Sequence, residues 1–316
     1  GHGEHGKSTL VGCLMTGEPD DGEGGARSYL DVKPHEIERG LSADLSYAVY
    51  GFDDGEPLRM NNPNRNSDRS ELVEKSEKLV SFVDTVGHKP WLRTTIRGLV
   101  GQKIDNGVLT VAADDGPTKT TKEHLGLLIA TDLPVITVIT KTDMVSDERV
   151  NEVQLEVEKI LRQVGRNPLS IERHGVETAI DEIGNGSVPI LKTSAVNMEG
   201  LDKLDHMFKN LPPVQDNYGQ EKLYIDKTYN IEGVGPVVSG TVQSGQINSG
   251  DEMLIGPMKN GEFRKTKIKS IEIHYYDVDK ADAGQIASLA VSNVETEELE
   301  RGMVLLPLDS DPEPVR

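Results

Sequence analysis

The chain opens with GHGEHGKS at residues 1–8, which is a complete G-x-x-x-x-G-K-[ST] phosphate loop. Such a loop joins a buried strand to a helix, and its backbone N–H groups cradle the phosphates of a nucleotide. Lys7 is expected to lie against the β- and γ-phosphates, and the Ser8 hydroxyl is expected to bind Mg²⁺. The pattern predicts a nucleoside triphosphate site; a flexible glycine turn is the alternative while the motif stands alone.

The first residue of the chain is already the first residue of this loop. The strand that normally precedes such a loop is missing, so we expect the chain to be a fragment at its N-terminus. Because that strand is normally central in its sheet, the loop is expected to be recognisable but poorly supported.

Apolar runs and helical patterns alternate from residue 8 to about residue 211. Buried parallel strands are predicted at 79–83, 107–113, 134–140 and 188–192. Helical spacing occurs at 118–131, 147–164 and 201–211. The alternation predicts a doubly wound, mainly parallel α/β sheet, on which ligands bind beyond the carboxyl ends of the strands. The polar residues 54–76 are interpreted as an excursion from a hairpin.

A linker is indicated at 212–222, where Pro212 and Pro213 begin a polar stretch. Short strands punctuated by glycine turns follow, at 223–229, 235–242, 252–255, 265–274 and 285–290. This pattern predicts a small antiparallel β-barrel. The expected domains are therefore a nucleotide-binding domain at 1–211, this linker, a barrel at 223–308 and the start of a second linker at 309–316.

Asp84 directly follows the predicted strand at 79–83 and begins the sequence Asp84-Thr85-Val86-Gly87-His88. A carboxylate in this position can hold Mg²⁺ through water, and the Gly87 N–H can face the γ-phosphate. Taken alone, Asp-x-x-Gly is more often a helix cap or a turn. Its weight comes from its place after a strand.

Two further motifs each follow a predicted strand and fit a guanine base. Asp143, in Thr140-Lys141-Thr142-Asp143, can accept hydrogen bonds from guanine N1–H and N2–H₂, a donor pair that adenine lacks. A backbone N–H at Ser194-Ala195 can reach guanine O6. Each short motif is weak, but the four in this order predict a guanine nucleotide site.

The charge balance is strongly acidic, with 53 Asp and Glu against 34 Lys and Arg and a formal net charge of −19. The excess is spread along the chain, which favours a solvated acidic surface and argues against broad non-specific nucleic-acid binding. Adaptation to molar salt and a merely acidic protein both fit it. Cys13 is the single cysteine, which fits a reducing compartment, and no apolar run is long enough to span a bilayer.

Together these motifs resemble the translational GTPases, the class of elongation factor Tu and elongation factor 1-alpha. A narrower similarity relates GEPDDGEGGAR at 17–27 and HEIERG at 35–40 to the GTP-binding protein 1 and 2 family, in an archaeal form. The resemblance covers the whole chain. It implies a P-loop GTPase domain followed by an antiparallel β-barrel of translation-factor type, with the family's third domain absent.

The resemblance also implies hydrolysis of GTP to GDP and phosphate, in a Mg²⁺-dependent switch that acts on the ribosome with aminoacyl-tRNA. A monomeric, cytoplasmic protein with no membrane partner is expected. His88 would orient the attacking water as the catalytic residue, and Ser42 would join Ser8 and Asp84 around Mg²⁺. The residues expected to bind GTP are Gly3, Glu4, His5, Gly6, Lys7, Ser8, Thr9, Gly87, Thr140, Lys141, Asp143, Ser194 and Ala195.

Three positions depart from the family pattern. Ser42 replaces the usual Thr, Thr140 replaces the common Asn, and Glu4 replaces a frequent Asp. The exchange at Thr140 is expected to weaken a tie to the phosphate loop. Two other functions stay open: the GTPase subunit of sulfate adenylyltransferase, and a weakly hydrolysing, GTP-dependent adaptor in RNA surveillance. The block at 17–40 favours the elongation-factor-like role.

Overall fold

The computed structural model describes residues 1–30, 46–85, 102–212 and 219–312. Three predicted site residues, Ser42, Gly87 and His88, lie outside these ranges. The chain divides into two compact units by its internal contacts. The first comprises Gly1–Asp68, Lys75–Leu99 and Asp105–Pro213, and the second comprises Arg69–Glu74, Val100–Ile104 and Val214–Arg316.

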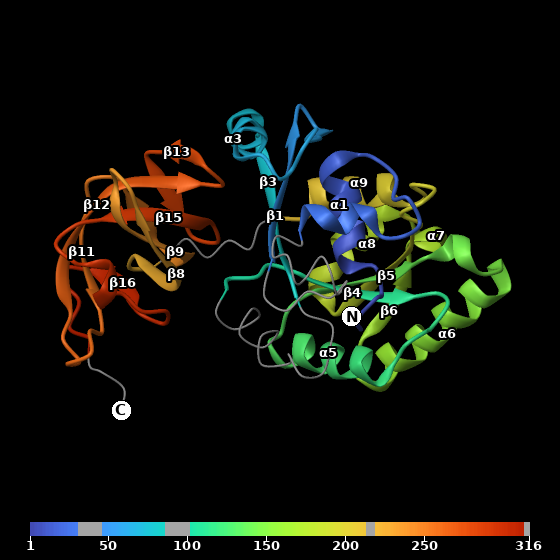
Figure 1. Cartoon of the computed structure of the whole chain (residues 1–316). Coiled ribbons are helices and arrows are strands. Elements are labelled where there is room, and N and C mark those ends of the chain that lie inside the picture. Colours follow the sequence, from blue (N-terminus) through green and yellow to red (C-terminus); the bar gives the residue numbers. More distant parts are fainter. Residues whose placement is uncertain (31–45, 86–101, 213–218, 313–316) are drawn as a thin grey trace. The chain divides into compact units, whose positions relative to one another are not determined.

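A four-stranded parallel sheet organises the first unit (Figure 1). Strands β4 (Gly107–Ala112) and β5 (Val135–Thr140) are almost continuous apolar runs, as is typical of parallel strands that are buried on both faces. They pair so that Val111 lies opposite Ile139, and their carboxyl ends reach the same edge. The predictions at 107–113, 134–140 and 188–192 are confirmed. In spatial order the strands are β4 Gly107–Ala112, β5 Val135–Thr140, β7 Ser187–Lys192 and β6 Asn167–Ser170.

Two helices, α5 (Lys119–Ala130) and α6 (Asp147–Gln163), pack on this sheet. Both begin at hydroxyl caps, because Thr118 accepts from the Thr121 N–H and Ser146 accepts from the Arg149 N–H. Their apolar sides join the strands in one core. It contains Leu109, Val111, Ala113, Leu125, Leu128, Val135, Ile139, Val150, Val153, Val157, Leu161, Val188 and Ile190.

The other helices of the first unit are shorter than α6. In Figure 1, α1 (Lys7–Thr16) and α9 (Leu201–Asn210) lie on the side of the sheet away from α5. The helices predicted at 118–131, 147–164 and 201–211 are confirmed. The remaining short elements show too few residues for a recognisable period. They are η1 Gly25–Tyr29, η3 Thr142–Met144, α7 Ile171–His174, α8 Val176–Glu182 and η4 Ile183–Asn185.

A separate antiparallel sheet corrects one prediction. The sequence predicts a parallel strand at 79–83, but β3 (Lys78–Asp84) pairs antiparallel with β1 (Ser46–Asp53). Most residues of β3 are only half-buried, so this strand is less completely buried than β4 and β5 although its sequence is also apolar. The hairpin strand β2 (Glu56–Leu58) and helix α3 (Asn66–Lys75) separate β1 from β3 in the chain. They form the predicted excursion.

Lys78 joins the start of β3 to the end of α9. Its Nζ donates to the carbonyl oxygens of Lys209 at 2.6 Å and Leu211 at 2.7 Å. The last carbonyls of a helix lack partners within the helix, and a cation is a favourable donor to them. The ammonium therefore fixes the segment by which the chain leaves the first unit.

The second unit contains a closed antiparallel β-barrel, as predicted. Its strands follow in the order β11-β16-β8-β9-β15-β12, and β12 pairs back onto β11, which removes the open edges. β13 (Tyr276–Val278) extends β12, while β10 (Gln246–Asn248) pairs with β14 (Lys280–Asp282). The barrel strands are β8 Lys222–Ile231, β9 Gly235–Ser244, β11 Glu252–Gly256, β12 Arg264–Ile273, β15 Ile286–Val291 and β16 Val304–Pro307, with the turn η5 Thr296–Glu298 before β16.

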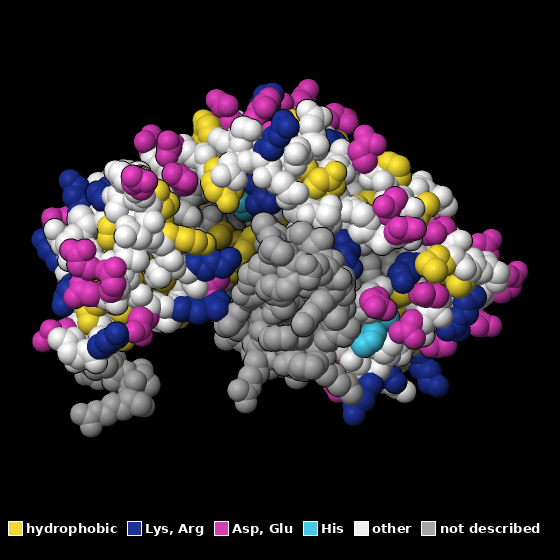
Figure 2. Space-filling model, viewed as in Figure 1, with side chains coloured by type: hydrophobic (Ala, Val, Ile, Leu, Met, Phe, Trp, Pro, Cys, Tyr) yellow, Lys and Arg dark blue, Asp and Glu magenta, His cyan; other side chains and the backbone are white. Residues whose placement is uncertain are grey.

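Acidic side chains are spread over the face seen in Figure 2, with basic side chains among them. This agrees with the even distribution of acidic residues along the sequence. Within the described residues, no helix combines the length and the apolar character needed to cross a membrane.

Helix α6 offers a stability test with an internal control. Leu161 is fully buried, whereas Leu155 on the same helix is 58% exposed. Leu161→Ala leaves a cavity in the core, so we expect it to lower the free energy of unfolding by about 2–5 kcal/mol. Leu155→Ala removes the same atoms from the surface and should change it by less than about 0.5 kcal/mol. Urea unfolding followed by circular dichroism measures both, and equal losses would contradict this packing.

Candidate functional site

The phosphate loop turns into α1 at Gly6. This residue has a left-handed φ of 72°, and a Cβ placed on it would lie 3.5 Å from Thr140 Oγ1. The left-handed backbone conformation favours glycine here, whereas the distance to Thr140 is an ordinary contact. The first turn of α1 contains no acidic residue. The N–H groups and the positive dipole end of the helix therefore favour an anion here.

Lys7 adds a positive charge to the same place. Its Nζ donates to the His2 carbonyl oxygen at 2.9 Å, which folds the side chain back over the loop. Burial lowers the pKa of the ammonium, and the nearby Asp84 carboxylate opposes that effect. An ammonium taken partly out of water gains most from a negatively charged ligand, because such a ligand replaces lost hydration.

Ser8 and Asp84 meet where β3 ends. Ser8 Oγ donates to Asp84 Oδ2 at 2.5 Å. A hydroxyl and a carboxylate are oxygen ligands of the kind that Mg²⁺ prefers, and Mg²⁺ needs few protein ligands because it keeps several waters. Within the described ranges, no group of three or more His, Cys, Asp or Glu is placed to hold a metal ion. A hydroxyl and a carboxylate that already meet therefore have the oxygen chemistry that a partly hydrated Mg²⁺ takes.

Thr140 ties the phosphate loop to the parallel sheet. From the last position of β5, its Oγ1 donates to the His5 carbonyl oxygen at 3.0 Å. The tie that was expected to weaken with Thr in place of Asn is therefore made. The His5 ring does not line the cavity described below, since its Nε2 lies 3.0 Å from Asp115 Oδ2. Burial lowers the pKa of His5, and Asp115 opposes that shift.

Asp143 is held rigidly beyond the same strand. It lies in the turn η3, which follows Lys141 with a left-handed φ of 59°. Ser194 Oγ donates to Asp143 Oδ1 at 2.6 Å, and the Asn197 N–H donates to Ser194 Oγ at 3.1 Å. Lys141 Nζ lies 3.6 Å from an Asp114 carboxylate oxygen. The Asp143 carboxylate is thereby oriented before any ligand arrives.

These groups surround one cavity of about 480 Å³, a size suited to a small molecule. His5 and Ser194 are buried behind its wall, where they support the loop and Asp143. Predicted site residues far apart in the sequence therefore gather at one place. Those that line the cavity are Gly3, Glu4, Gly6, Lys7, Ser8, Thr9, Thr140, Lys141, Asp143 and Ala195.

Known families match both units of the chain. Residues 1–213 match the family of the elongation factor Tu GTP-binding domain, and residues 235–306 match that of elongation factor Tu domain 2. The chain belongs to the translational GTPases. The resemblance to the translational GTPases is confirmed.

Curated relatives extend the similarity over nearly the whole chain of this translational GTPase. GTP-binding protein 2 of Mus musculus is 33% identical over 324 residues, covering 99% of this chain and 54% of the relative. GTP-binding protein 1 of Xenopus laevis is 34% identical over 315 residues, covering 97% and 48%. The selenocysteine-specific elongation factor of Escherichia coli (strain K12) is 30% identical over 318 residues, covering 99% and 42%. The chain thus spans about half the length of these relatives.

Solved structures confirm the fold class of this GTPase. The bacterial selenocysteine-specific elongation factor EF-Sec superposes with a TM-score of 0.73 at 23% identity, over 97% of this chain and 44% of that chain. Translation elongation factor SelB from Methanococcus maripaludis, in complex with the GTP analogue GppNHp, gives 0.67 at 24% identity, over 98% and 54%. Both therefore share a P-loop GTPase domain followed by a barrel.

Sequence reasoning missed one wall of the GTPase cavity. The wall is the segment after α1, and the side chain that organises it is Asp20. The Asp20 carboxylate accepts from the N–H groups of Gly22 at 3.0 Å, Gly24 at 3.1 Å and Ala26 at 3.0 Å. An Asp-x-Gly-x-Gly pattern is typical of such a turn and could have indicated it. The unpredicted lining residues are Leu10, Asp20, Gly22, Glu23, Gly24, Arg27, Thr85, Met144, Thr193 and Val196.

Two threonines on β5 provide a test of the tie between sheet and loop. Thr140 donates to the buried loop, whereas the Thr137 hydroxyl is buried and makes no hydrogen bond among the described residues. Thr140→Val should lower the free energy of unfolding by about 1–3 kcal/mol, because it leaves a buried carbonyl unpaired. Thr137→Val should be neutral or stabilising, because it removes an unsatisfied hydroxyl. Urea unfolding compares them, and the reverse order would contradict the assigned bond.

Proposed function

We propose that this protein binds GTP with Mg²⁺, hydrolyses it, and acts as an elongation-factor-like switch on the ribosome. The observation that carries the proposal is that residues suited to bind phosphate and residues suited to bind guanine line the same cavity. Lys7 and Ser8 line its phosphate end, where α1 begins, and the Ser8 hydroxyl bonds Asp84, which is not part of the lining. Asp143 and Ala195 line its base end, beyond β5 and β7. A guanine nucleotide has phosphates and a base that match these two ends.

The base end is built to prefer guanine. A carboxylate at Asp143 accepts from N1–H and N2–H₂ of guanine together, while adenine lacks this donor pair and would leave the carboxylate without those two hydrogen bonds. Ser194 holds the carboxylate through its Oδ1 atom, so little ordering is needed when a base binds. The recognition of guanine O6 is assigned to a backbone N–H at Ser194-Ala195, and Ala195 lines the cavity.

The phosphate end combines three effects. The start of α1 offers backbone N–H groups and a positive dipole, and Lys7 neutralises phosphate charge. Ser8, Asp84 and Ser42 would hold Mg²⁺, which neutralises charge on the β- and γ-phosphates when it is bound. Support for Ser8 and Asp84 comes from their mutual hydrogen bond, and Ser42 rests on the sequence resemblance.

Hydrolysis is assigned to a water that His88 orients towards the γ-phosphate, with the Gly87 N–H facing that phosphate. Both residues rest on the sequence, because they lie outside the described ranges. Intrinsic turnover is expected to be slow, since the imidazole would be positioned productively only on the ribosome.

The ribosomal role and an aminoacyl-tRNA partner rest on relationship. A relative that is 30% identical over 99% of this chain is a selenocysteine-specific elongation factor, and both family matches are to elongation factor Tu domains. The remaining parts of the proposal are a monomeric state and a cytoplasmic location.

Guanine selection can be tested at Asp143. In Asp143→Asn the new amide donates a hydrogen bond where xanthine presents an acceptor and guanine presents a donor. We expect GDP affinity to fall about 10- to 100-fold and binding to favour xanthosine diphosphate, as measured by competition at equilibrium. Asp181→Asn removes an exposed carboxylate from the same unit and should change neither affinity. Unaltered GDP preference in Asp143→Asn would refute the assignment.

The role of His88 can be tested on ribosomes. His88→Ala should reduce ribosome-stimulated GTP turnover by about 10²–10⁴-fold while GDP affinity stays unchanged, because the imidazole acts only on the attacking water. His206→Ala removes a half-exposed imidazole from α9 and serves as the control. Single-turnover phosphate release gives the rates. The role fails if the variant keeps full stimulation, or if the unaltered protein has no stimulated turnover to lose.

A further inference from the structure

The segment after α1 forms a rigid turn that we name the Asp20 loop, residues 20–27. The Asp20 carboxylate is 8% exposed and receives three backbone N–H bonds, which replace its lost hydration. Gly22 and Gly24 take left-handed conformations, with φ of 85° and 86°, that let the backbone wrap round the carboxylate. The loop is therefore ordered by its own sequence.

Helix α1 supports this loop from behind. A Cβ placed on Gly12 would lie 2.1 Å from the Ala26 carbonyl oxygen, so only glycine lets the helix and the loop approach so closely. The loop is thus fixed against the same helix whose first turn lies at the phosphate end of the cavity.

The loop also connects the two ends of the cavity. At the base end, the Asp20 N–H donates to the Ala195 carbonyl oxygen at 2.9 Å, and a Cβ on Gly22 would lie 4.0 Å from Val196. At the phosphate end, a Cβ on Gly24 would lie 3.9 Å from Thr9 Oγ1. Whatever joins a base at Asp143 to phosphates at Lys7 must therefore lie alongside this loop. In a nucleotide, those groups are the ribose and the α-phosphate.

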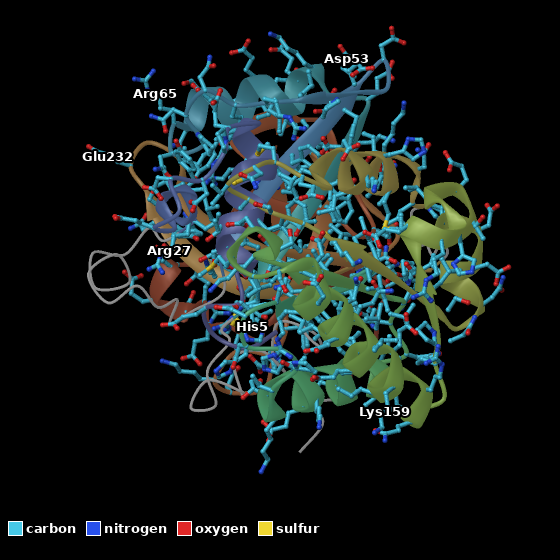
Figure 3. The ribbon with its side chains drawn as sticks, turned by 90° about the vertical axis from the view of Figure 1, so that its right-hand side faces the viewer. His5, Arg27, Asp53, Arg65, Lys159 and Glu232 are labelled. Atoms are coloured by element: carbon cyan, nitrogen blue, oxygen red, sulfur yellow. The ribbon has the colours of Figure 1, made fainter. Side chains whose placement is uncertain are left out.

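Arg27 brings a positive charge to this position. It belongs to the turn η1 and is labelled in Figure 3, and it is one of the residues that line the cavity. Its Cδ would lie 3.5 Å from the same Cβ on Gly24 that approaches Thr9. Among the described residues, the cationic side chains that line the cavity are Lys7 at the phosphate end, Lys141 beside Asp114, and Arg27 beside Gly24. A guanidinium presents several N–H donors in a plane that matches phosphate oxygens.

We propose that Arg27 binds the α-phosphate of the nucleotide, and that the Asp20 loop positions it along the ribose. The proposal rests on the guanine nucleotide site proposed above and adds to it a binding residue that follows α1. Because GDP and GTP share the α-phosphate, Arg27 should serve both nucleotides equally. Arg27 therefore increases the affinity for both nucleotides and does not help the protein to distinguish GDP from GTP.

The test measures affinities of the complete protein for GDP and GTP by equilibrium titration. Arg27→Ala should weaken both by the same factor, about 10- to 100-fold, as expected for the loss of a charge-assisted hydrogen bond. The affinities of Arg27→Lys should lie between those of the unaltered protein and those of Arg27→Ala, because an ammonium keeps the charge but loses the paired donors. Arg65→Ala removes an exposed arginine from the same unit and should leave both affinities unchanged.

Two further measurements separate a phosphate contact from its rivals. The loss in Arg27→Ala should be the same with 2′-deoxy-GDP, because the α-phosphate is still present, and the melting temperature of the nucleotide-free protein should stay unchanged. The assignment would be overturned if Arg27→Ala kept its GDP affinity, or if it lost affinity for GTP alone. It would also be overturned if the loss disappeared with 2′-deoxy-GDP, or if the melting temperature of the nucleotide-free variant fell. If the unaltered protein binds no GDP, the proposed function itself fails, which is a distinct result.

Discussion

One hydrogen bond, from Thr140 to the His5 carbonyl oxygen, holds the site in relation to the sheet. Thr140 ends β5, and the turn that carries Asp143 begins two residues later. The same strand end therefore fixes the phosphate loop on one side and the base-recognising carboxylate on the other. Because parallel strands end at a common edge, a single short contact sets the distance between groups that must grip opposite ends of one ligand.

The sequence predicts most of what depends on long periodic patterns or on family motifs. Strands β4, β5 and β7 are mostly apolar runs, and α6 begins after the N-cap residue Ser146. The barrel follows from short strands separated by glycines. The lining residues Lys7, Ser8 and Asp143 were identified because each type has a defined chemical task. Their order after successive strands predicts one shared site, but the contacts that hold it, such as the bond from Thr140 to the His5 carbonyl oxygen, could not be read from the sequence.

Other features of the structure could not be predicted from the sequence, for physical reasons. β3 has the apolar composition of a buried strand, and composition does not distinguish parallel from antiparallel pairing. The direction depends on its partner β1, which the sequence analysis did not predict. His5 belongs to the motif, but its ring bonds Asp115 behind the cavity, because only its backbone is required in the loop. The Asp20 loop was visible only as a similarity, since three bonds to one carboxylate are a product of backbone geometry.

The two ends of strand β3 hold different things. Asp84 at its end bonds Ser8, and Lys78 at its start bonds the carbonyls that finish α9. An extended strand of this length spans about 20 Å. One strand therefore connects the Ser8–Asp84 pair with the segment by which the chain leaves the first unit.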